Sequence, residues 1–132
     1  YPPLIKDSNP AMPGPVRIPA GAEPPLFTVD VEDRDVADTL FIRVFRDYAN
    51  TPEPPRNDLP RANDPAAGSV LRTVELQTNT WCANAAKNVN LVFDVVVADR
   101  PFLEDLSVVP VYRAVPPGAE LSVKSWVIEC IE

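Results

Sequence analysis

Alternating hydrophobic and polar residues along the chain predict β-strands. The clearest window is residues 26–32, LFTVDVE, in which Phe27, Val29 and Val31 face one side and the polar residues face the other. Further windows rich in β-forming residues lie at 39–48, 69–77, 89–98 and 120–130, with a short edge strand expected at 15–19. The window 89–98 is the most hydrophobic, so we expect it to form the central strand.

Prolines separate these windows from one another. The 17 prolines fall into clusters, which leave proline-free windows at 26–51, 66–100 and 118–132. Proline cannot donate a hydrogen bond to a sheet, so we expect strands in the windows and loops in the clusters. No long window shows a helical period, and the short candidate at 81–88 is a helix or a loop.

The spacing of these elements predicts an all-β fold in one domain. Several short strands joined by proline-rich connections favour a β-sandwich, with a barrel as the runner-up. Residues 1–25 are expected to form a proline-rich tether and edge segment, with residues 1–14 as an extended spacer, and residues 26–132 to form the sandwich domain. The long segment 49–68 is either ordered against the body or a mobile recognition element.

Composition narrows the chemistry that the chain can perform. The formal net charge is −7, which argues against binding to nucleic acid phosphates. The chain has no histidine, which excludes Ser-His-Asp and Cys-His centres and most transition-metal sites. Only four glycines are present, and none forms a phosphate-binding loop. We therefore expect a protein that is not an enzyme.

The two cysteines, Cys82 and Cys130, suit a single disulfide. If the strands 89–98 and 120–130 pair with Ala98 beside Leu121, the other end of the pairing places Val89 beside Cys130. Cys82 then lies close to Cys130 at one end of the sheet. The alternative is two free buried thiols. A disulfide would indicate an oxidising compartment, either secreted or periplasmic and outer-membrane.

The stretch DVEDRDVAD at residues 30–38 is strongly acidic. The same strand register assigns this turn and the turn that follows Ala98 to the other end of the sheet, and in a sandwich the loop between the second and third strands clusters with the loop between the last two. Acids from both turns could therefore bind calcium, which takes about six to eight oxygen ligands. The candidate ligands are Asp33, Asp35, Asp38, Asp99 and Asp105. The alternative is that Asp33 and Asp35 only cap a tight turn through side-chain hydrogen bonds. No other metal or cofactor is expected.

The segment 101–119 is long and apolar in places, which makes it a candidate contact with a protein partner. Its candidate contact residues are Phe102, Leu103, Val111 and Tyr112. The preferred alternative is that these side chains fold back over the open end of the core. A carbohydrate-binding surface would instead need exposed aromatic residues, for which Tyr48, Trp81, Phe102 and Tyr112 are the candidates.

Three stretches resemble an immunoglobulin-like domain of uncharacterised bacterial cell-envelope lipoproteins. They are FTVDVEDRDVADTLFIRVFRDY (27–48), VVVADRPF (95–102) and SWVIE (125–129). The resemblance implies an immunoglobulin-like antiparallel sandwich of about 6–7 strands. It also implies a lipidated cysteine ahead of a proline-rich spacer, so that Tyr1 would follow the anchor.

The expected function is a structural or adhesive module of a secreted or lipid-anchored envelope protein. Its partner would be a protein, with no nucleic acid and no membrane contact except through an N-terminal lipid anchor. No run of the sequence approaches the roughly 18 apolar residues of a membrane-spanning helix. The alternative is a calcium-dependent or carbohydrate-binding sandwich module.

Overall fold

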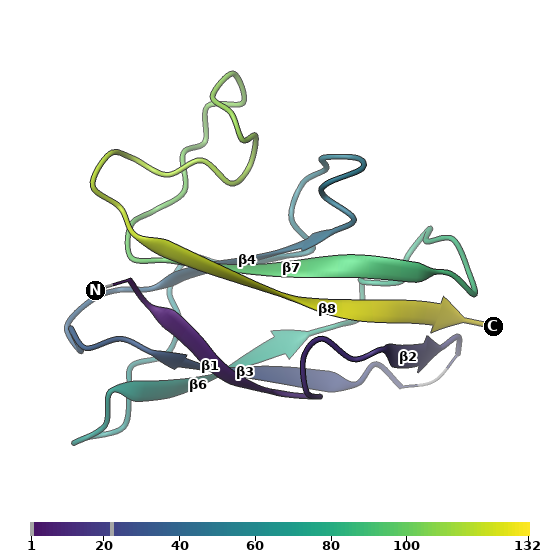
Figure 1. Cartoon of the computed structure of the whole chain (residues 1–132), viewed down its shortest axis with the longest axis horizontal. Coiled ribbons are helices and arrows are strands. Elements are labelled where there is room, and N and C mark those ends of the chain that lie inside the picture. Colours follow the sequence, from purple (N-terminus) through teal and green to yellow (C-terminus); the bar gives the residue numbers. More distant parts are fainter. Residues whose placement is uncertain (1, 22) are drawn as a thin grey trace.

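Two β-sheets pack face to face in the computed structural model, which describes residues 2–21 and 23–132 (Figure 1). Within these residues there are eight strands and no helix. The strands are β1 (Leu4–Asn9), β2 (Val16–Pro19), β3 (Leu26–Glu32), β4 (Phe41–Arg46), β5 (Asn57–Leu59), β6 (Leu71–Gln77), β7 (Asn90–Ala98) and β8 (Leu121–Ile131). The prediction of an all-β sandwich is therefore confirmed.

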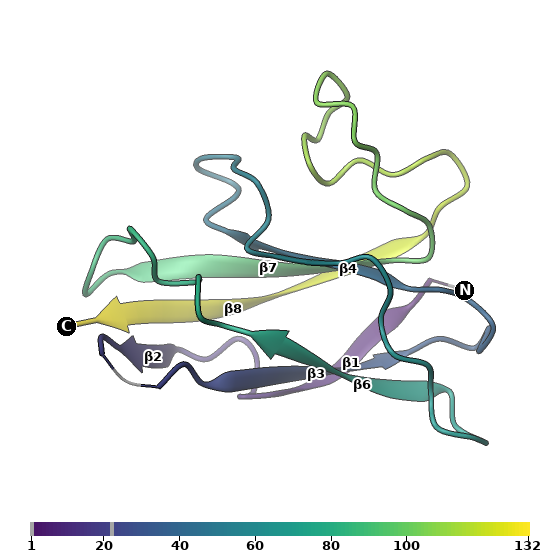
Figure 2. The ribbon, with the colours of Figure 1, turned by 180° about the vertical axis from the view of Figure 1, so that it is seen from behind.

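One sheet has the strand order β1-β3-β6 and the other has the order β2-β8-β7-β4-β5. Neighbouring strands are antiparallel except for β2, which runs parallel to β8 and pairs Val16 with Ile128. The segment between β5 and β6 crosses from the five-stranded sheet to the three-stranded sheet (Figure 2). The segment 49–68 is ordered against the body because β5 pairs with β4. This outcome agrees with one of the two alternatives predicted for the segment.

Each of the six predicted strand windows overlaps a strand, and β3 has the predicted bounds. The window 81–88 forms turns, so the loop alternative holds there. The register of β7 and β8 also follows the prediction, because Ala98 pairs with Leu121 and Asn90 with Glu129.

The core lies between the sheets and is built around aromatic rings. Phe27 of β3 contacts Trp126 of β8 edge-on at 4.9 Å between ring centroids, and it contacts Trp81 at 5.1 Å. Trp81 stacks on Phe93 of β7 at 5.0 Å. All four side chains are fully or almost fully buried. Each such side chain contributes about 1.5–3 kcal/mol through its removal from water.

A disulfide joins Cys82 to Cys130, with 5.8 Å between their Cα atoms. It links the turn before β7 to the end of β8, as the register predicted. The amide N–H of Asn88 also donates a hydrogen bond to the carbonyl of Cys130, at 2.7 Å. This end of the sandwich is therefore closed by a covalent bond and by the backbone.

The expected tether over residues 1–14 is instead part of the sandwich from Leu4 onwards. β1 pairs with β3, and Ile5 is only 3% exposed in the core. Beyond β1, the indole N–H of Trp126 donates to the carbonyl of Pro10 at 2.8 Å. Prolines here lie in the link between the strands, where no N–H is needed for a ladder, so their density did not exclude packing.

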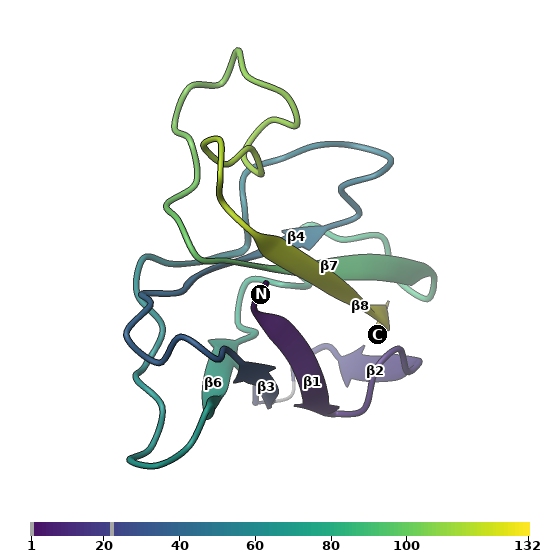
Figure 3. The ribbon, with the colours of Figure 1, turned by 60° about the vertical axis from the view of Figure 1, so that its left-hand side comes forward.

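Part of the outer face of the five-stranded sheet is covered as well. Phe45 of β4 and Val96 of β7 point away from the main core and pack with Phe102 in a second hydrophobic cluster. The loop 99–120 rises over this face (Figure 3). The preferred expectation that the loop would cover the open end of the core is corrected: it covers the outer face of β4 and β7.

Candidate functional site

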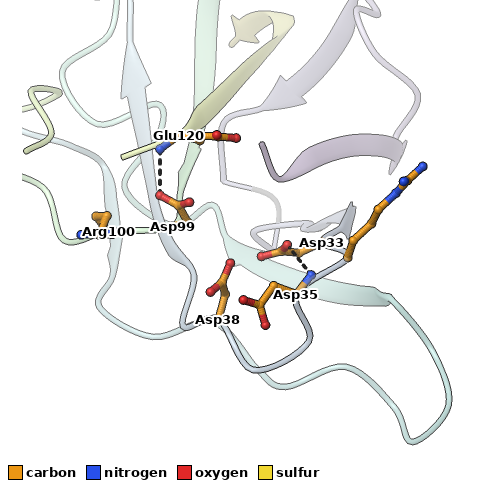
Figure 4. Close-up of a pocket in the computed structure, with 7 residues that line it drawn as sticks. Asp33, Asp35, Asp38, Asp99, Arg100 and Glu120 are labelled. Carbon is orange, nitrogen blue, oxygen red and sulfur yellow. Dashed lines mark hydrogen bonds between the residues drawn. The ribbon is translucent and has the colours of Figure 1, made fainter. Parts of the chain in front are cut away.

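An acidic pocket of about 590 Å³ lies where the turn after β3 meets the connection from β7 to β8. The pairing of Phe41 with Ala98 places Asp38 and Asp99 just beyond the ends of two adjacent strands. The lining residues are Asp33, Arg34, Asp35, Asp38, Asp99, Arg100 and Glu120 (Figure 4). Acids from two distant parts of the sequence therefore share one pocket.

The turn itself is held by aspartate side chains that accept backbone hydrogen bonds. The amide N–H of Asp35 donates to Asp33 Oδ1 at 3.0 Å, and the amide of Ala37 donates to Asp35 Oδ1 at 3.1 Å. The amide of Asp38 then donates to the carbonyl of Asp35 at 3.0 Å. These bonds confirm the predicted capping role, which short polar side chains commonly play in turns.

Asp33 is the buried member of the group. The residue is 2% exposed, and its second oxygen, Oδ2, is buried with no hydrogen-bond partner among the described residues. Its carboxylate points toward those of Asp35 and Asp38 (Figure 4). A buried polar atom without a partner costs about 1–3 kcal/mol, more when it is charged.

The Asp38 side chain is half-buried and titrates abnormally. Burial, followed by the hydrogen bond that a protonated Asp38 would donate to Asp33 and by the negative charges of Asp33 and Asp35, raises the pKa of Asp38 from 3.8 to about 6. Carboxylates that share a site repel one another when charged, so protonation becomes easier. The negative charges in the pocket therefore repel one another, and this repulsion favours protonation of Asp38.

The structure brings together four of the five predicted calcium ligands and excludes the fifth. Asp105 lies outside the pocket, where its Oδ1 accepts hydrogen bonds from the amide of Ser107 at 2.9 Å and from its hydroxyl at 2.7 Å. These bonds lower the pKa of Asp105. Asp105 is far along the loop that rises over the outer face, so sequence proximity to Asp99 was misleading.

Glu120 is the pocket residue that sequence reasoning missed. It directly precedes β8, and its amide donates to Asp99 Oδ1 at 2.8 Å. The predicted pairing of Ala98 with Leu121 contained this information, because the residues just outside a strand pair also face each other. Among the described residues, no group of three or more acidic or cysteine side chains stands close enough to hold a metal ion as it is.

Two arginines fix the loop 99–120 to the sheet beneath it, the buried Arg43 of β4 and the half-buried Arg113 of the loop itself. Arg43, which is 5% exposed, donates to the carbonyl of Tyr112 at 2.7 Å and to Glu104 at 3.0 Å. Arg113 pairs with Asp94 at 2.9 Å and lies over the ring of Tyr48. The amide of Leu103 donates to the carbonyl of Ala114 at 2.8 Å, which closes the base of the loop.

The four predicted contact residues lie in the base of this loop. Phe102 is only 6% exposed, and Leu103, Val111 and Tyr112 are half-buried. The exposed apolar side chains are at the tip, where Leu106 is 59% exposed and Val109 is 83% exposed. Sequence reasoning missed this tip because it favoured the bulkiest residues, and bulky residues are the ones that pack.

The aromatic candidates for a carbohydrate platform do not form an exposed strip. Trp81 is fully buried in the core, and Phe102 is buried in the outer cluster. Tyr48 and Tyr112 are half-buried and pack against the same cluster. Their rings stabilise the loop rather than forming an open stacking surface.

The fold and the acidic pocket are the features of this chain that bear on its function. Within the part of the chain that the structure describes, there is no helix of a length and hydrophobicity that would cross a membrane. Neither the family models, the curated proteins nor the solved structures yield a match to this chain.

Proposed function

We propose that the chain is a non-enzymatic, immunoglobulin-like interaction module of a secreted or lipid-anchored bacterial envelope protein. Immunoglobulin domains place strands A, B and E in one sheet and strands G, F and C in the other, with C′ following C in variable-type domains. The sheets β1-β3-β6 and β8-β7-β4-β5 occupy these positions in the same order. This correspondence supports the finer assignment within the β-sandwich class.

The proposed compartment is supported by the disulfide between Cys82 and Cys130. Disulfides persist in secreted and periplasmic proteins and are rare in the reducing cytosol. The formal net charge of −7 favours partners with neutral or basic surfaces over nucleic acid. A protein partner in an envelope or extracellular assembly is therefore the proposed ligand.

The observation that carries this proposal is the tip of the loop 99–120. The loop is anchored at its base by Arg43 and Arg113, yet it presents Leu106 and Val109 to solvent. Apolar side chains held out on an anchored loop lose little conformational entropy when a partner covers them. We propose that these two side chains enter an apolar pocket on a partner protein.

The test is a pair of matched double variants used as bait on the native envelope fraction. Leu106→Asp with Val109→Asp should abolish capture of a partner that the wild-type chain retains. Leu26→Asp with Leu71→Asp is the control. Leu26 is 48% exposed and Leu71 is 42% exposed, and each lies at the end of a strand in the three-stranded sheet. Circular dichroism establishes that both variants are folded.

Equal capture by the loop variant and the wild-type chain would exclude the tip as the contact. Loss of capture by the control variant alone would place the contact on the three-stranded sheet instead. Recovery of the native protein as a soluble, unlipidated species without partners would contradict the envelope assembly.

A further inference from the structure

The Asp33 carboxylate is fixed in place but only half satisfied. Its Oδ1 is bound by the amide of Asp35 at 3.0 Å, and its own amide donates to the carbonyl of Val70 at 3.0 Å. These two bonds set the direction of the side chain, so the carboxylate does not turn to find another donor. Its buried Oδ2 is left facing the pocket without a hydrogen-bond partner among the described residues (Figure 4).

The surroundings of this oxygen are rich in further oxygen atoms. The carboxylates of Asp35 and Asp38 converge on it, and Asp99 lines the same pocket (Figure 4). The lining holds five acidic and two basic residues, which leaves a formal charge of −3. A positive group at this point would satisfy the buried oxygen and reduce the repulsion between the acids.

We propose that Asp33, Asp35 and Asp38 bind a calcium ion, with Asp33 as the preset ligand. Oxygen-only ligand sets select hard cations, and carboxylates of mixed orientation suit calcium, which accepts irregular geometry and completes its shell with backbone carbonyls and water. Magnesium demands a smaller and more regular octahedral site. A pocket of about 590 Å³ leaves room for several water ligands.

The three acids need a small closure to reach one ion, since no such group is close enough as it stands among the described residues. Asp35 is exposed and Asp38 is half-buried, and both lie on the turn, so a small rotation would bring Asp38 and the second oxygen of Asp35 toward Asp33 while Asp35 Oδ1 keeps its bond from the amide of Ala37. Asp33 remains where the backbone holds it. Calcium binding should therefore tighten the turn without rearranging the sheets.

The experiment uses the full chain at pH 7.5 after treatment with a chelator, titrated with calcium chloride in a calorimeter. We expect one binding event in the range of about 0.1–1 mM, as in extracellular calcium modules. Thermal unfolding should shift upward with calcium, because a ligand that binds only the folded state stabilises it. Sodium chloride at equal ionic strength is the control for general screening, and magnesium chloride is the control for cation size.

The variants identify the ligands. Asp33→Asn keeps an oxygen for the amide of Asp35 and should weaken calcium binding by about tenfold or more. Asp38→Asn should weaken calcium binding as well, and it replaces a carboxylate that accepts no backbone hydrogen bond among the described residues. Asp105→Asn is the matched control, because Asp105 lies outside the pocket and should leave binding unchanged.

The highest calcium concentration tested, about 10 mM, lies tenfold above the upper end of the expected range. If neither binding heat nor a thermal shift is seen at this concentration, the proposal is overturned. An equal loss in Asp105→Asn and Asp33→Asn would also overturn it, as would an equal response to sodium chloride. These outcomes leave the proposed partner contact at Leu106 and Val109 untouched, because that contact lies on a different loop.

Discussion

Removal of the Cys82–Cys130 disulfide should weaken the fold by an amount that follows from its place in the chain. The bond closes a loop with a sequence separation of 48 residues. The chain-entropy model converts a loop of this length into about 4 kcal/mol of unfolding free energy. For a chain of this size, the melting temperature should fall by more than about 10 °C. The perturbation is Cys82→Ala with Cys130→Ala.

The assay is urea unfolding followed by tryptophan fluorescence, since Trp81 and Trp126 are both fully buried. The oxidised wild-type chain, the reduced wild-type chain and the double variant are compared at one pH. The reduced chain and the variant should agree with each other to within about 1 kcal/mol, because the change to alanine removes only one sulfur atom from the buried Cys130 and one from the partly buried Cys82. A loss below about 1 kcal/mol in both would refute the reasoning and indicate a compact unfolded chain.

Three further perturbations probe the pocket, the loop and the core. Asp38→Asn, measured in chelator, should become more stable relative to the wild-type chain as pH rises. In the wild-type chain the folded-state pKa of Asp38 is about 6, above the ordinary value of 3.8. The bound proton therefore stabilises the wild-type fold fully below pH 3.8, and this stabilisation is lost as pH rises through 6. After allowance for solvent screening the difference should reach about 1–2 kcal/mol at pH 7, and a pH-independent difference in urea midpoints would contradict it. Arg43→Met removes the cation that binds Glu104 and the carbonyl of Tyr112, and it should speed protease cleavage near Leu106 while far-ultraviolet dichroism is kept. Unchanged cleavage would show that Arg113 and the other contacts of the loop hold it without Arg43. Phe27→Ala, at the centre of the aromatic core, should cost about 3–5 kcal/mol of unfolding free energy in urea, whereas a cost near 1 kcal/mol would mean that the core collapses around the gap.

The central strands could be predicted because their residues satisfy several requirements at once. β3 alternates cleanly, and β7 is apolar on both faces because the main core lies on one side and part of the outer cluster on the other. The pairing of β7 with β8 then led to the disulfide, and the pairing of β4 with β7 places Asp38 and Asp99 beside the same pocket. Local patterns and the register of one strand pair carried most of the fold.

Two strands, β1 and β5, could not be predicted because little in their sequence distinguishes them from loops. In β1 only Ile5 is fully buried, and in β5 no residue is, so hydrophobic alternation is absent. Both strands are specified by the partner strands to which they add, β3 and β4. Tertiary pairing decided these elements, and single-sequence propensity does not record it.

The candidate site was predictable where it depended on turns beside paired strands and unpredictable where it depended on the path of a loop. Asp33, Asp35 and Asp38 are fixed by the end of β3. Asp105 was misplaced because the loop after Asp99 climbs over the outer face, drawn there by Phe102 and by the bond between Arg43 and Glu104. The path of this loop can be inferred only once Phe45 of β4 is known to face outward.

The parallel pairing of β2 with β8 has a mechanical consequence. The chain enters β1 at one end of the sandwich and leaves β8 at the other (Figure 1). Tension applied between the two ends of the chain would draw β1 from β3 before it pulls β2 backward and β8 forward, and the hydrogen bonds from Val16 to Pro19 would then bear the load together in shear instead of opening one by one. A force applied between the two ends of the chain would therefore have to break this pairing as a unit, and β2 and β8 would act as a mechanical clamp.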